Sequence, residues 1–569
     1  MLSAKSPKLV SSFILFCLIL LAVLISNPVL RNPRSYFEQA ANQWKVFFTS
    51  WNAKDPSYES RLDLEMQSLV FQARSVKDFY YIPLSDHVRE PEIVSTALPK
   101  RYVNDKNLQY APGAPVIFMY GPQPQPPSLE SQTRQLYWMR WARMAIALLC
   151  WIGATAFFSH LSISIRILLG AFITGWGLWL TSLVLGLSLQ QIYNVWVPLC
   201  LFGALIVCAR GANKITRKSI QKFLKTQWTL ILSLILFPSL WMPFFMSPLS
   251  GPDARSMWFH RYKFEYFFGF IPQEIVRFMY EGSQRDYPWF LGGAVGIASW
   301  MDGIHIHGWN ENAVYGTLVW LLVALLSVLW SQLSNVKHLW KLFILPLGFL
   351  PFEGFICNGY MDVFWITSFG LFLAGYFSKS MQQRKLWLLA ALAASFKNEG
   401  VACLMMFLLY LFVSRKGRQE TIGITLREVL TWATAFSIPV FQKIYLSTWG
   451  IYDQYRLSSR IMTYPLYDAI KRWESLHRYL IRDIFIRRPS YFLPVFLMVL
   501  GAYLYRRGNQ GWRTFGFTYM LCIPISLIYV YTPHDQDWQL ITSGSRVFML
   551  YPIWCTIVLL NMMKSRSQS

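Results

Sequence analysis

The chain has 569 residues, of which 54% are hydrophobic, 17% aromatic and only 14% charged, and its mean hydropathy is +0.32. Soluble globular proteins average about 25% charged residues, so this composition excludes a soluble enzyme and a disordered chain. The formal net charge of +24 would suit a nucleic-acid-binding protein, but most Lys and Arg residues lie in loops between apolar blocks, as is typical of membrane proteins. Because several of these blocks reach about 18 residues, enough to cross a bilayer core, we expect an all-α polytopic membrane protein.

The N-terminal part of the chain has one apolar block and one long polar stretch. The block, at about 9–26, follows Lys5 and Lys8. Because no small-residue cleavage motif comes after it, we predict an uncleaved anchor rather than a signal peptide. The polar stretch, at about 31–135, is too hydrophilic to span a membrane and ends in a Pro-rich connector, which indicates a small extramembrane domain.

The remaining apolar blocks predict a bundle of about fourteen spans in total. After the first block, the predicted spans lie at about 142–159, 167–186, 191–209, 228–247, 313–333, 342–358, 362–378, 386–396, 400–413, 429–446, 491–505, 514–532 and 547–563. We therefore divide the chain into four parts: a membrane anchor (1–27), a small extracytoplasmic domain (28–136), additional transmembrane helices (137–227) and a main transmembrane region (228–569).

Lys and Arg residues in short loops set the orientation of such a protein. A cytoplasmic N-terminus places the loop 210–227, which carries six basic residues and no acid, on the cytoplasmic side. The polar stretches 31–135, 248–311 and 534–546 then lie outside. The segment 448–490 departs from the rule because it puts eight basic residues outside, but long loops obey the rule weakly.

Two acidic residues of the outer stretch 248–311 are candidates for chemistry. Asp253 follows a Gly-Pro turn that leads the chain out of the fifth span. A carboxylate at the membrane face suits a general base that takes a proton from a substrate hydroxyl, and a helix N-cap is the alternative. Asp286 precedes a short apolar segment, 290–300, that predicts a re-entrant or interfacial helix. A turn with a capped helix explains this segment equally well.

Two further groups of charges lie at predicted membrane boundaries. Lys397 and Glu399 stand between two apolar blocks, where charges usually line a cavity or pair with each other. A tight outer turn with a snorkelling lysine is the alternative. Arg546 begins the last span behind a Thr-Ser-Gly-Ser run, and an arginine beside hydroxyls and backbone N–H groups suits a phosphate. An interfacial arginine at a helix end is the alternative.

The segment 461–489 predicts a basic amphipathic helix that lies in the membrane interface and would also contact an anionic lipid headgroup. His305 and His307 beside Asp302 lack further ligands at a set spacing, so we predict no metal site. We also predict no cofactor, and the absence of a Walker motif argues against ATP hydrolysis within this chain.

Taken together, these motifs resemble the GT-C superfamily of integral-membrane glycosyltransferases, which includes protein O-mannosyltransferases and lipid A aminoarabinose transferases. The likeness covers roughly 228–550 and rests on Pro252-Asp253-Ala254-Arg255-Ser256-Met257-Trp258 followed by Lys263, Asp286-Tyr287-Pro288, Asn358-Gly359-Tyr360-Met361-Asp362, Lys397-Asn398-Glu399-Gly400, and Asp537-Trp538 followed by Ser543 and Arg546. The acidic loop of the common GT-C pattern comes directly after the first span, whereas Asp253 follows the fifth and has no acidic neighbour.

The resemblance implies a GT-C-like catalytic transmembrane region at 228–569 and an inverting transferase. Such an enzyme moves a sugar from a polyprenyl-phosphate-linked donor to a hydroxyl of a lipid, glycan or protein acceptor. On that pattern Asp253 is the general base, and Asp286 and Glu399 orient the base, the sugar or the acceptor.

The same resemblance assigns the donor phosphate to basic residues. Lys397 and Arg546 would hold it, with Arg255 and Lys263 as further candidates. The active site would lie on the periplasmic side of a bacterial inner membrane, in contact with membrane lipid and not with nucleic acid.

Two other functions remain open, a lipid-linked glycan transporter and a non-catalytic membrane scaffold of a polysaccharide pathway. A transporter predicts charges near mid-membrane and internally repeated halves, and the sequence has no obvious internal repeat.

Overall fold

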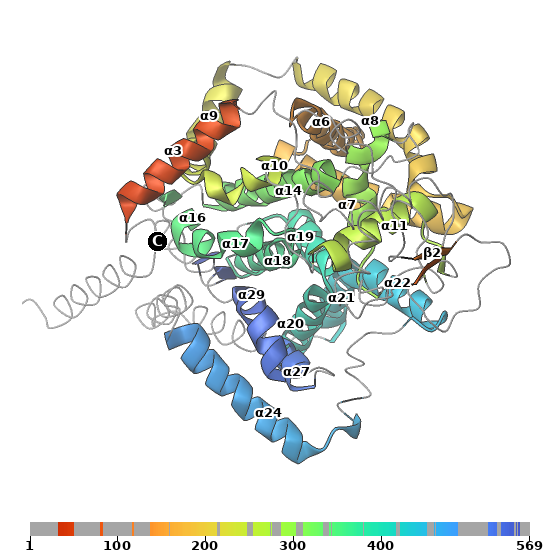
Figure 1. Cartoon of the computed structure of the whole chain (residues 1–569), viewed down its shortest axis with the longest axis vertical. Helices are drawn as coiled ribbons and strands as arrows, with labels where there is room; N and C mark the ends of the chain where they lie inside the picture. The colour runs from red at the N-terminus through yellow and green to blue at the C-terminus, as the bar shows by residue number, and fades with distance from the viewer. Residues whose placement is uncertain are drawn as a thin grey trace, which may run out of the picture.

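The computed structural model describes residues 32–49, 80–82, 116–118, 137–158, 160–212, 217–246, 254–272, 275, 286–302, 311–333, 341–342, 344–378, 381–416, 422–451, 460, 462–486, 522–531, 536–550, 553–554 and 556–557. Over these residues the chain is mainly helical (Figure 1). Two strands of three residues each, β1 (Tyr80–Ile82) and β2 (Val116–Phe118), pair in parallel with Tyr80 opposite Val116.

The helices fall into two groups along the chain. The first group consists of α3 (Pro33–Thr49), α6 (Tyr137–Gly153), α7 (Ile163–Leu185), α8 (Leu189–Ala212), α9 (Arg217–Leu236), η3 (Pro238–Leu240), α10 (Pro243–Met246), η4 (Ala254–Phe259), α11 (His260–Phe268), α13 (Phe290–Val295), η6 (Gly296–Asp302) and α14 (Glu311–Gln332). The second consists of α16 (Ile344–Gly348), η7 (Leu350–Phe352), α17 (Glu353–Ile356), α18 (Asp362–Phe377), α19 (Gln383–Phe396), α20 (Asn398–Lys416), α21 (Ile422–Ala433), η8 (Thr434–Phe436), α22 (Ser437–Ser447), α24 (Leu466–Tyr479), η9 (Leu480–Ile486), α27 (Cys522–Val530), α28 (Gln536–Gln539), η10 (Leu540–Gly544) and α29 (Ser545–Phe548).

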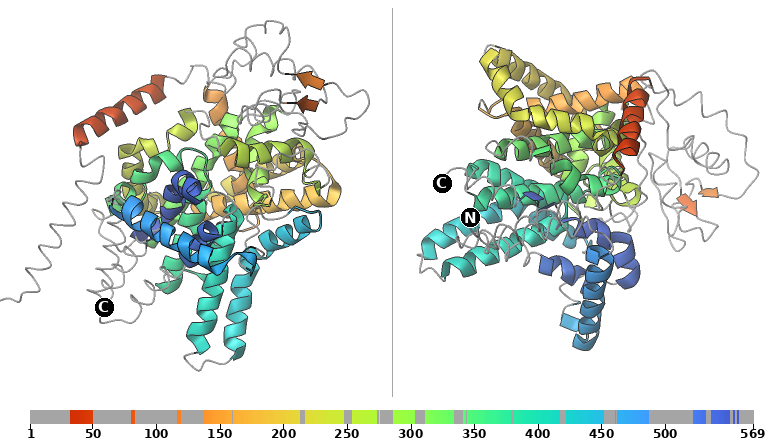
Figure 2. Two further views of the ribbon diagram at one scale, coloured as in Figure 1. Left: turned by 60° about the horizontal axis from the view of Figure 1, so that its bottom comes forward. Right: turned by 90° about the vertical axis from the view of Figure 1, so that its left-hand side faces the viewer.

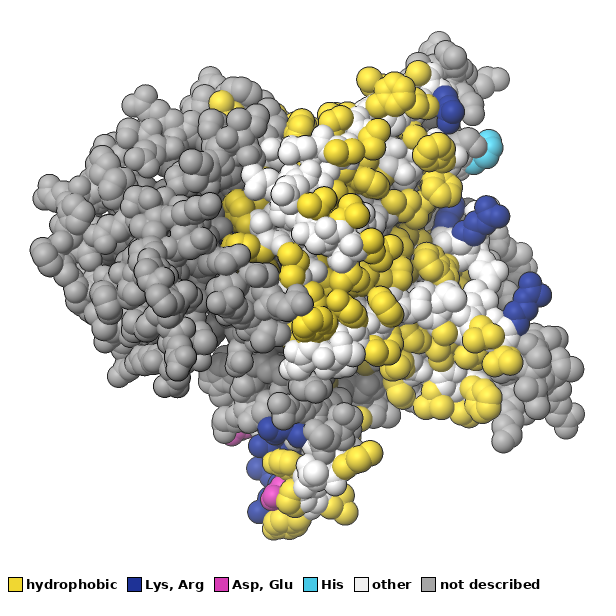
Figure 3. All heavy atoms as spheres, turned by 90° about the vertical axis from the view of Figure 1, so that its right-hand side faces the viewer, with side chains coloured by type: hydrophobic (Ala, Val, Ile, Leu, Met, Phe, Trp, Pro, Cys, Tyr) yellow, Lys and Arg dark blue, Asp and Glu magenta, His cyan; other side chains and the backbone are white. Residues whose placement is uncertain are grey.

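Three of the described helices are long and apolar enough to cross a membrane: Ile163–Leu185, Leu189–Gly211 and Asn312–Gln332. They coincide with three of the predicted spans. The surface agrees with a lipid environment, because α8 turns Val195, Leu199, Phe202 and Leu205 outward with exposures of 62–67%. Figure 3 shows apolar side chains as a broad band on one face of the molecule, with Lys and Arg side chains along one of its edges. Basic side chains at the border of an apolar surface are typical of membrane proteins.

Prolines divide three of the predicted spans into shorter pieces. The expected span 228–247 ends as a regular helix at Leu236 and continues as η3 and α10 beyond Pro238. The expected span 342–358 is likewise α16, η7 and α17, and 429–446 is α21, η8 and α22. Proline lacks the amide proton and clashes with the preceding turn, which weakens the helix before it, although α8 continues through Pro198. The predicted spans 9–26 and 491–505 lie outside the described residues.

The short apolar segment after Asp286 forms α13 and η6, which pack inside the bundle. α13 lies against the middle of α7, where a Cβ on Gly175 would come within 2.2 Å of the carbonyl oxygen of Phe290. The ring of Trp176 stacks on that of Phe290 at 6.0 Å. Every residue of α13 is buried. The close approach of the two helices depends on the missing side chain of Gly175.

Helices α18, α19 and α20 form a tightly packed group in the second half of the chain. α19 contributes a buried run of alanines, Ala390, Ala391, Ala393 and Ala394, which lets its neighbours approach closely. A Cβ on Gly400 would meet the carbonyl oxygen of Ala393 at 2.0 Å. The chain therefore reverses sharply at Lys397, and the start of α18 lies beside this reversal.

Candidate functional site

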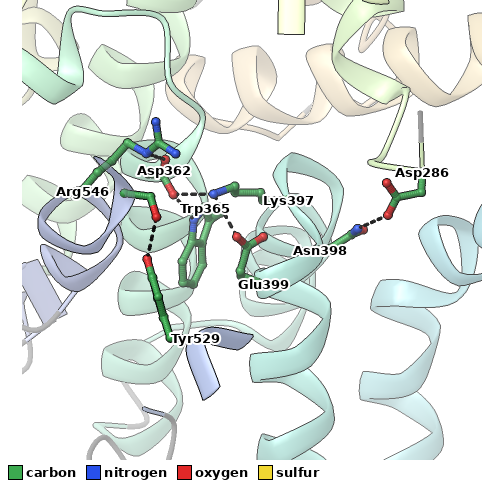
Figure 4. Close-up of polar contacts among 9 residues, drawn as sticks. Asp286, Asp362, Trp365, Lys397, Asn398, Glu399, Tyr529 and Arg546 are labelled. Atoms are coloured by element: carbon green, nitrogen blue, oxygen red, sulfur yellow. Dashed lines mark hydrogen bonds and ion pairs between the residues drawn. The ribbon is translucent and has the colours of Figure 1, made fainter. Parts of the chain in front are cut away.

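Four charged side chains from three separate segments meet at one end of the α18–α20 group (Figure 4). Asp362 is the first residue of α18, Lys397 lies between α19 and α20, and Glu399 is in the first turn of α20. Arg546 comes from α29, nearly two hundred residues after Asp362 in the sequence. We call these four residues the charge cluster.

Lys397 is the centre of the charge cluster. Its Nζ lies 2.8 Å from Oδ1 of Asp362 and 2.9 Å from Oε1 of Glu399. The second cation approaches from the opposite side, with Nε of Arg546 3.1 Å from Oδ2 of Asp362. All four residues are buried, with exposures between 1% and 8%. Two cations thus share one carboxylate, and the formal charges of the cluster sum to zero.

Tyr360 provides a platform for Arg546. The guanidinium carbon lies 4.0 Å from the centre of the Tyr360 ring, a cation–π contact that fixes the plane of the guanidinium. The turn that delivers Tyr360 passes through Gly359 with φ +77°, a conformation that residues with a Cβ rarely adopt. The Asn358–Asp362 motif therefore places both the ring under Arg546 and the carboxylate beside it.

The electrostatic balance keeps Lys397 charged. Burial alone lowers the pKa of Lys397, but the nearby carboxylates of Asp362 and Glu399 raise it, so the net pKa lies above the ordinary lysine value. One acceptor remains available, because within the described part of the chain Oε2 of Glu399 is buried without a hydrogen-bond partner. An unsatisfied buried carboxylate oxygen is costly, and a ligand hydroxyl in its reach would remove that cost.

Asp286 forms a second acidic position beside Asn398, the residue that follows Lys397 in the chain. Its Oδ2 accepts a hydrogen bond from Nδ2 of Asn398 at 2.9 Å and lies 3.6 Å from Nζ of Lys443 on α22. Gln442 holds the backbone beside Asp286, since it donates to the carbonyl of Tyr287 and accepts from the amide of Trp289. Figure 4 shows Asp286 on its loop beside the charge cluster, linked to it through Asn398.

A third buried group, on α11, contacts the loop that carries Asp286. The guanidinium of Arg261 lies 5.0 Å from the ring centre of Trp258 and 5.8 Å from that of Trp289, and donates to the carbonyl of Pro288 at 3.0 Å. Glu265 is fully buried, and neither of its carboxylate oxygens has a hydrogen-bond partner among the residues described. Burial raises the pKa of Glu265 well above its ordinary value, although the charge of Arg261 opposes this shift. Arg261 therefore ties α11 to the loop that carries Asp286.

The structure brings together several of the residues that the sequence singles out. Lys397, Glu399 and Arg546 belong to one cluster, and Asp286 lies beside it. Lys263 is buried on α11 with 5% exposure.

Two of the predicted site residues cannot be assessed from the geometry. Asp253, the expected general base, lies outside the described residues, and only the backbone of Arg255 is described, in η4. The stretch with His305 and His307 also lies outside them.

Sequence reasoning gave no role to Asp362, Asn398 or Lys443. An aspartate at the start of an apolar helix has the pattern of an N-cap, yet no side-chain cap hydrogen bond is present at this helix start. The only signal for Asp362 was its place in the Asn358–Asp362 motif. Lys443 interrupts the apolar helix α22, and an unexplained charge within such a helix was the available sign.

In chemical terms the site combines buried cations with carboxylates at the ends of apolar helices. Such cations stabilise an anion that forms at the membrane edge, and the carboxylates suit hydrogen bonding to hydroxyl groups. In comparisons with known proteins, no family model, no curated protein and no solved structure matches this chain.

Proposed function

We propose that the protein is a membrane glycosyltransferase that moves a sugar from a polyprenyl-phosphate-linked donor to an acceptor hydroxyl. The acceptor would be a lipid, a glycan or a protein side chain, and the reaction would invert the anomeric carbon. The proposal includes a GT-C-like bundle of about fourteen spans, with the active site on the periplasmic side of a bacterial inner membrane. The observation that carries it is the convergence of Lys397 and Arg546 on Asp362 at the end of apolar helices.

The charge cluster suits a lipid phosphate for an electrostatic reason. A phosphodiester at the membrane edge carries one negative charge, and the phosphate that leaves after transfer carries more. Fixed cations gain most where charge develops in the transition state, so Lys397 and Arg546 would favour departure of the polyprenyl phosphate. Arginine adds a planar fork of N–H donors that matches phosphate geometry.

The formal charges of the cluster sum to zero, so an incoming phosphate has to displace one of its two carboxylates, and we infer that this is Glu399. A phosphate that approaches Lys397 must compete with the two carboxylates that Lys397 already contacts at 2.8 and 2.9 Å. Asp362 is also held by Arg546, whereas Glu399 has no second cation in the cluster. We therefore assign to the donor phosphate the position of Glu399 beside Lys397, which frees Glu399 to accept a hydroxyl of the sugar or the acceptor.

The reaction then balances as a single displacement. The acceptor oxygen forms a bond to the anomeric carbon while the bond from that carbon to the phosphate oxygen breaks. Asp253 takes the acceptor proton as general base, a contribution of about 10²–10⁴-fold, and the bonding electrons leave with the polyprenyl phosphate. Asp286, held by Asn398, orients the acceptor or the base. Arg255 and Lys263 are further candidates for binding the donor phosphate.

The test is release of free polyprenyl phosphate from a panel of polyprenyl-phosphate sugars. Purified protein would be assayed with acceptors from a membrane extract, beside Asp253→Asn and Lys397→Met. Arg384→Gln is the matched control, because Arg384 is an exposed cation at the opposite end of α19. We expect release by the wild type and the control and little release by the other two.

Each alternative outcome has a definite meaning. Binding of a donor without release by any protein would favour a lipid-linked glycan transporter or a non-catalytic scaffold. Equal release by wild type and Asp253→Asn would keep the enzyme but remove Asp253 as its base, which would make Asp286 the next candidate.

A further inference from the structure

Helix α24 and the η9 turn that follows it present three distinct faces. One face is buried in the protein and carries Ala469, Leu476 and Leu480. The second face is apolar and exposed: its residues, at helical spacing, are Leu466 (74% exposed), Ile470 (58%), Trp473 (36%) and Ile481 (57%). The protein leaves this apolar stripe uncovered within its described part.

The third face of α24 is charged. Lys471, Arg478 and Arg482 lie along it and are exposed, with Glu474 2.5 Å from Arg478 and Asp483 3.1 Å from Arg482. Over residues 460–488 the chain has seven basic and three acidic residues, a formal net charge of +4. An apolar stripe that adjoins a basic stripe is the pattern of a helix that lies in a membrane surface and meets anionic headgroups.

The orientation of α24 fits that position. Both views of Figure 2 show α24 running across the direction of the paired helices α20 and α21. If α20 and α21 run across the membrane, this crossing directs α24 along its surface. Figure 3 shows basic and apolar side chains side by side at the lower end of the molecule, apart from the broad apolar band.

α24 is also joined to the segment that carries Arg546. Nε2 of Gln536 donates to the carbonyl of Arg472 at 2.7 Å, and Nη1 of Arg472 donates to the carbonyl of Val530 at 3.3 Å. Farther along, a Cβ on Gly544 would lie 2.9 Å from the ring of Tyr479. The position of α24 therefore constrains Val530, Gln536 and Gly544, and α29 with Arg546 begins directly after Gly544.

We propose that α24 is a docking surface for anionic phospholipid, with its apolar stripe in the acyl boundary and its basic stripe on the headgroups. Docking holds the 536–548 segment in place and so keeps Arg546 over Tyr360 and beside Asp362. The lipid thus supports the charge cluster through α24 and does not contact its residues directly. This inference does not depend on the glycosyltransferase proposal, since lipid docking would serve any reaction or transport at the site.

The test uses the full chain in nanodiscs of phosphatidylcholine, with or without about 30% phosphatidylglycerol. Hydrogen exchange of the peptide 466–482 is the first readout, and we expect exchange to slow about threefold or more in the anionic discs. The variant Lys471→Gln/Arg478→Gln/Arg482→Gln should lose this difference. The control Arg384→Gln/Lys385→Gln/Arg427→Gln, which removes three basic residues elsewhere on the surface, should keep it.

A photo-crosslinking residue at Ile470 gives the second readout. We expect phospholipid adducts at Ile470, more of them in anionic discs, and none when the same residue replaces buried Leu476. Equal exchange in both kinds of disc would overturn the proposal, as would adducts with protein instead of lipid at Ile470. Neither readout requires turnover, so an inactive protein that passes both tests would count against the proposed function alone.

Discussion

The charge cluster predicts that the free energy of unfolding falls strongly when one member of a buried ion pair is removed. Lys397 contacts two buried carboxylates, whereas Asp362 retains Arg546 when Lys397 is lost. Lys397→Met therefore leaves Glu399 as the uncompensated charge, in a position only 8% exposed. Removal of one partner from a buried ion pair costs about 3–5 kcal/mol, and we expect a loss of unfolding free energy in that range.

A second substitution should recover most of that loss. Lys397→Met/Glu399→Gln removes both members of one pair and leaves the Arg546–Asp362 pair, 3.1 Å apart, in place. Because no buried charge is then without a partner, we expect the double variant to lie within about 1–2 kcal/mol of the wild type, which corresponds to a coupling energy of about 2–3 kcal/mol. Donor binding should nevertheless stay lost, because the phosphate contact is gone.

The assay is unfolding of the purified protein in mixed micelles titrated with a denaturing detergent, followed by tryptophan fluorescence. All four members of the cycle would be compared: wild type, Lys397→Met, Glu399→Gln and the double variant. Additive effects of the two substitutions would refute the reasoning, because the pairing of Lys397 with Glu399 requires non-additivity. A cost below about 1 kcal/mol for Lys397→Met would do the same, since it is the value of an exposed pair.

Three further predictions concern other contacts. Arg546→Lys keeps the charge but loses the planar contact with Tyr360 at 4.0 Å and the fork of N–H donors, so we expect donor affinity, measured by equilibrium binding, to fall about tenfold or more without loss of folded protein. The pKa of Glu265 is raised in the folded state. Above about pH 4.5 the Glu265 carboxyl therefore loses its proton in the unfolded chain while it still holds it in the folded protein. The unfolding free energy of the wild type relative to Glu265→Gln should therefore fall as pH rises above about 4.5, by up to about 1.4 kcal/mol per pH unit, and a flat difference would contradict the buried neutral carboxyl. Gly175→Ala should destabilise by about 1–3 kcal/mol because its Cβ would lie 2.2 Å from the carbonyl of Phe290, whereas Gly177→Ala, with nothing within 4 Å, should cost much less in the same detergent titration.

The helical architecture was predictable where a long apolar block forms a single helix, which in α8 continues through Pro198. The blocks at 167–186, 191–209 and 313–333 became α7, α8 and α14 almost residue for residue. Hydropathy averages over a window and does not register a single backbone amide. The blocks that contain Pro238, Pro346 and Pro439 therefore appeared continuous, although each consists of two or three shorter helices. The total of about fourteen spans stays a prediction.

Part of the candidate site was predictable because buried charges are conspicuous in an apolar chain. Lys397, Glu399 and Arg546 stand out for that reason, and the sequence interpretation already offered pairing as one outcome. Their common partner was not predictable, because Asp362 lies 35 residues before Lys397 and 184 residues before Arg546. Only the packing of α18, α19 and α29 brings these positions together. The same applies to Lys443, whose contact with Asp286 spans 157 residues.

If the protein is the proposed glycosyltransferase, the positions of the charge cluster and of Asp286 argue that the sugar donor and the acceptor approach from different sides. The charge cluster is enclosed, with the side chain of Lys397 only 6% exposed, whereas Lys443 beside Asp286 is 39% exposed. Under the proposed function a lipid-linked phosphate has to reach Lys397 and Arg546, and the segment that carries Arg546 is joined to α24. Asp286 is itself only 2% exposed, so under the proposed function an acceptor hydroxyl from the aqueous side would meet Lys443 first and Asp286 behind it. Asn398, adjacent to Lys397 and bonded to Asp286, is then the residue that sets the separation of the two reactants. Asn398→Asp would place a second negative charge 2.9 Å from Asp286 and should impair acceptor use while it spares donor binding, whereas equal loss of both would argue for a single shared site.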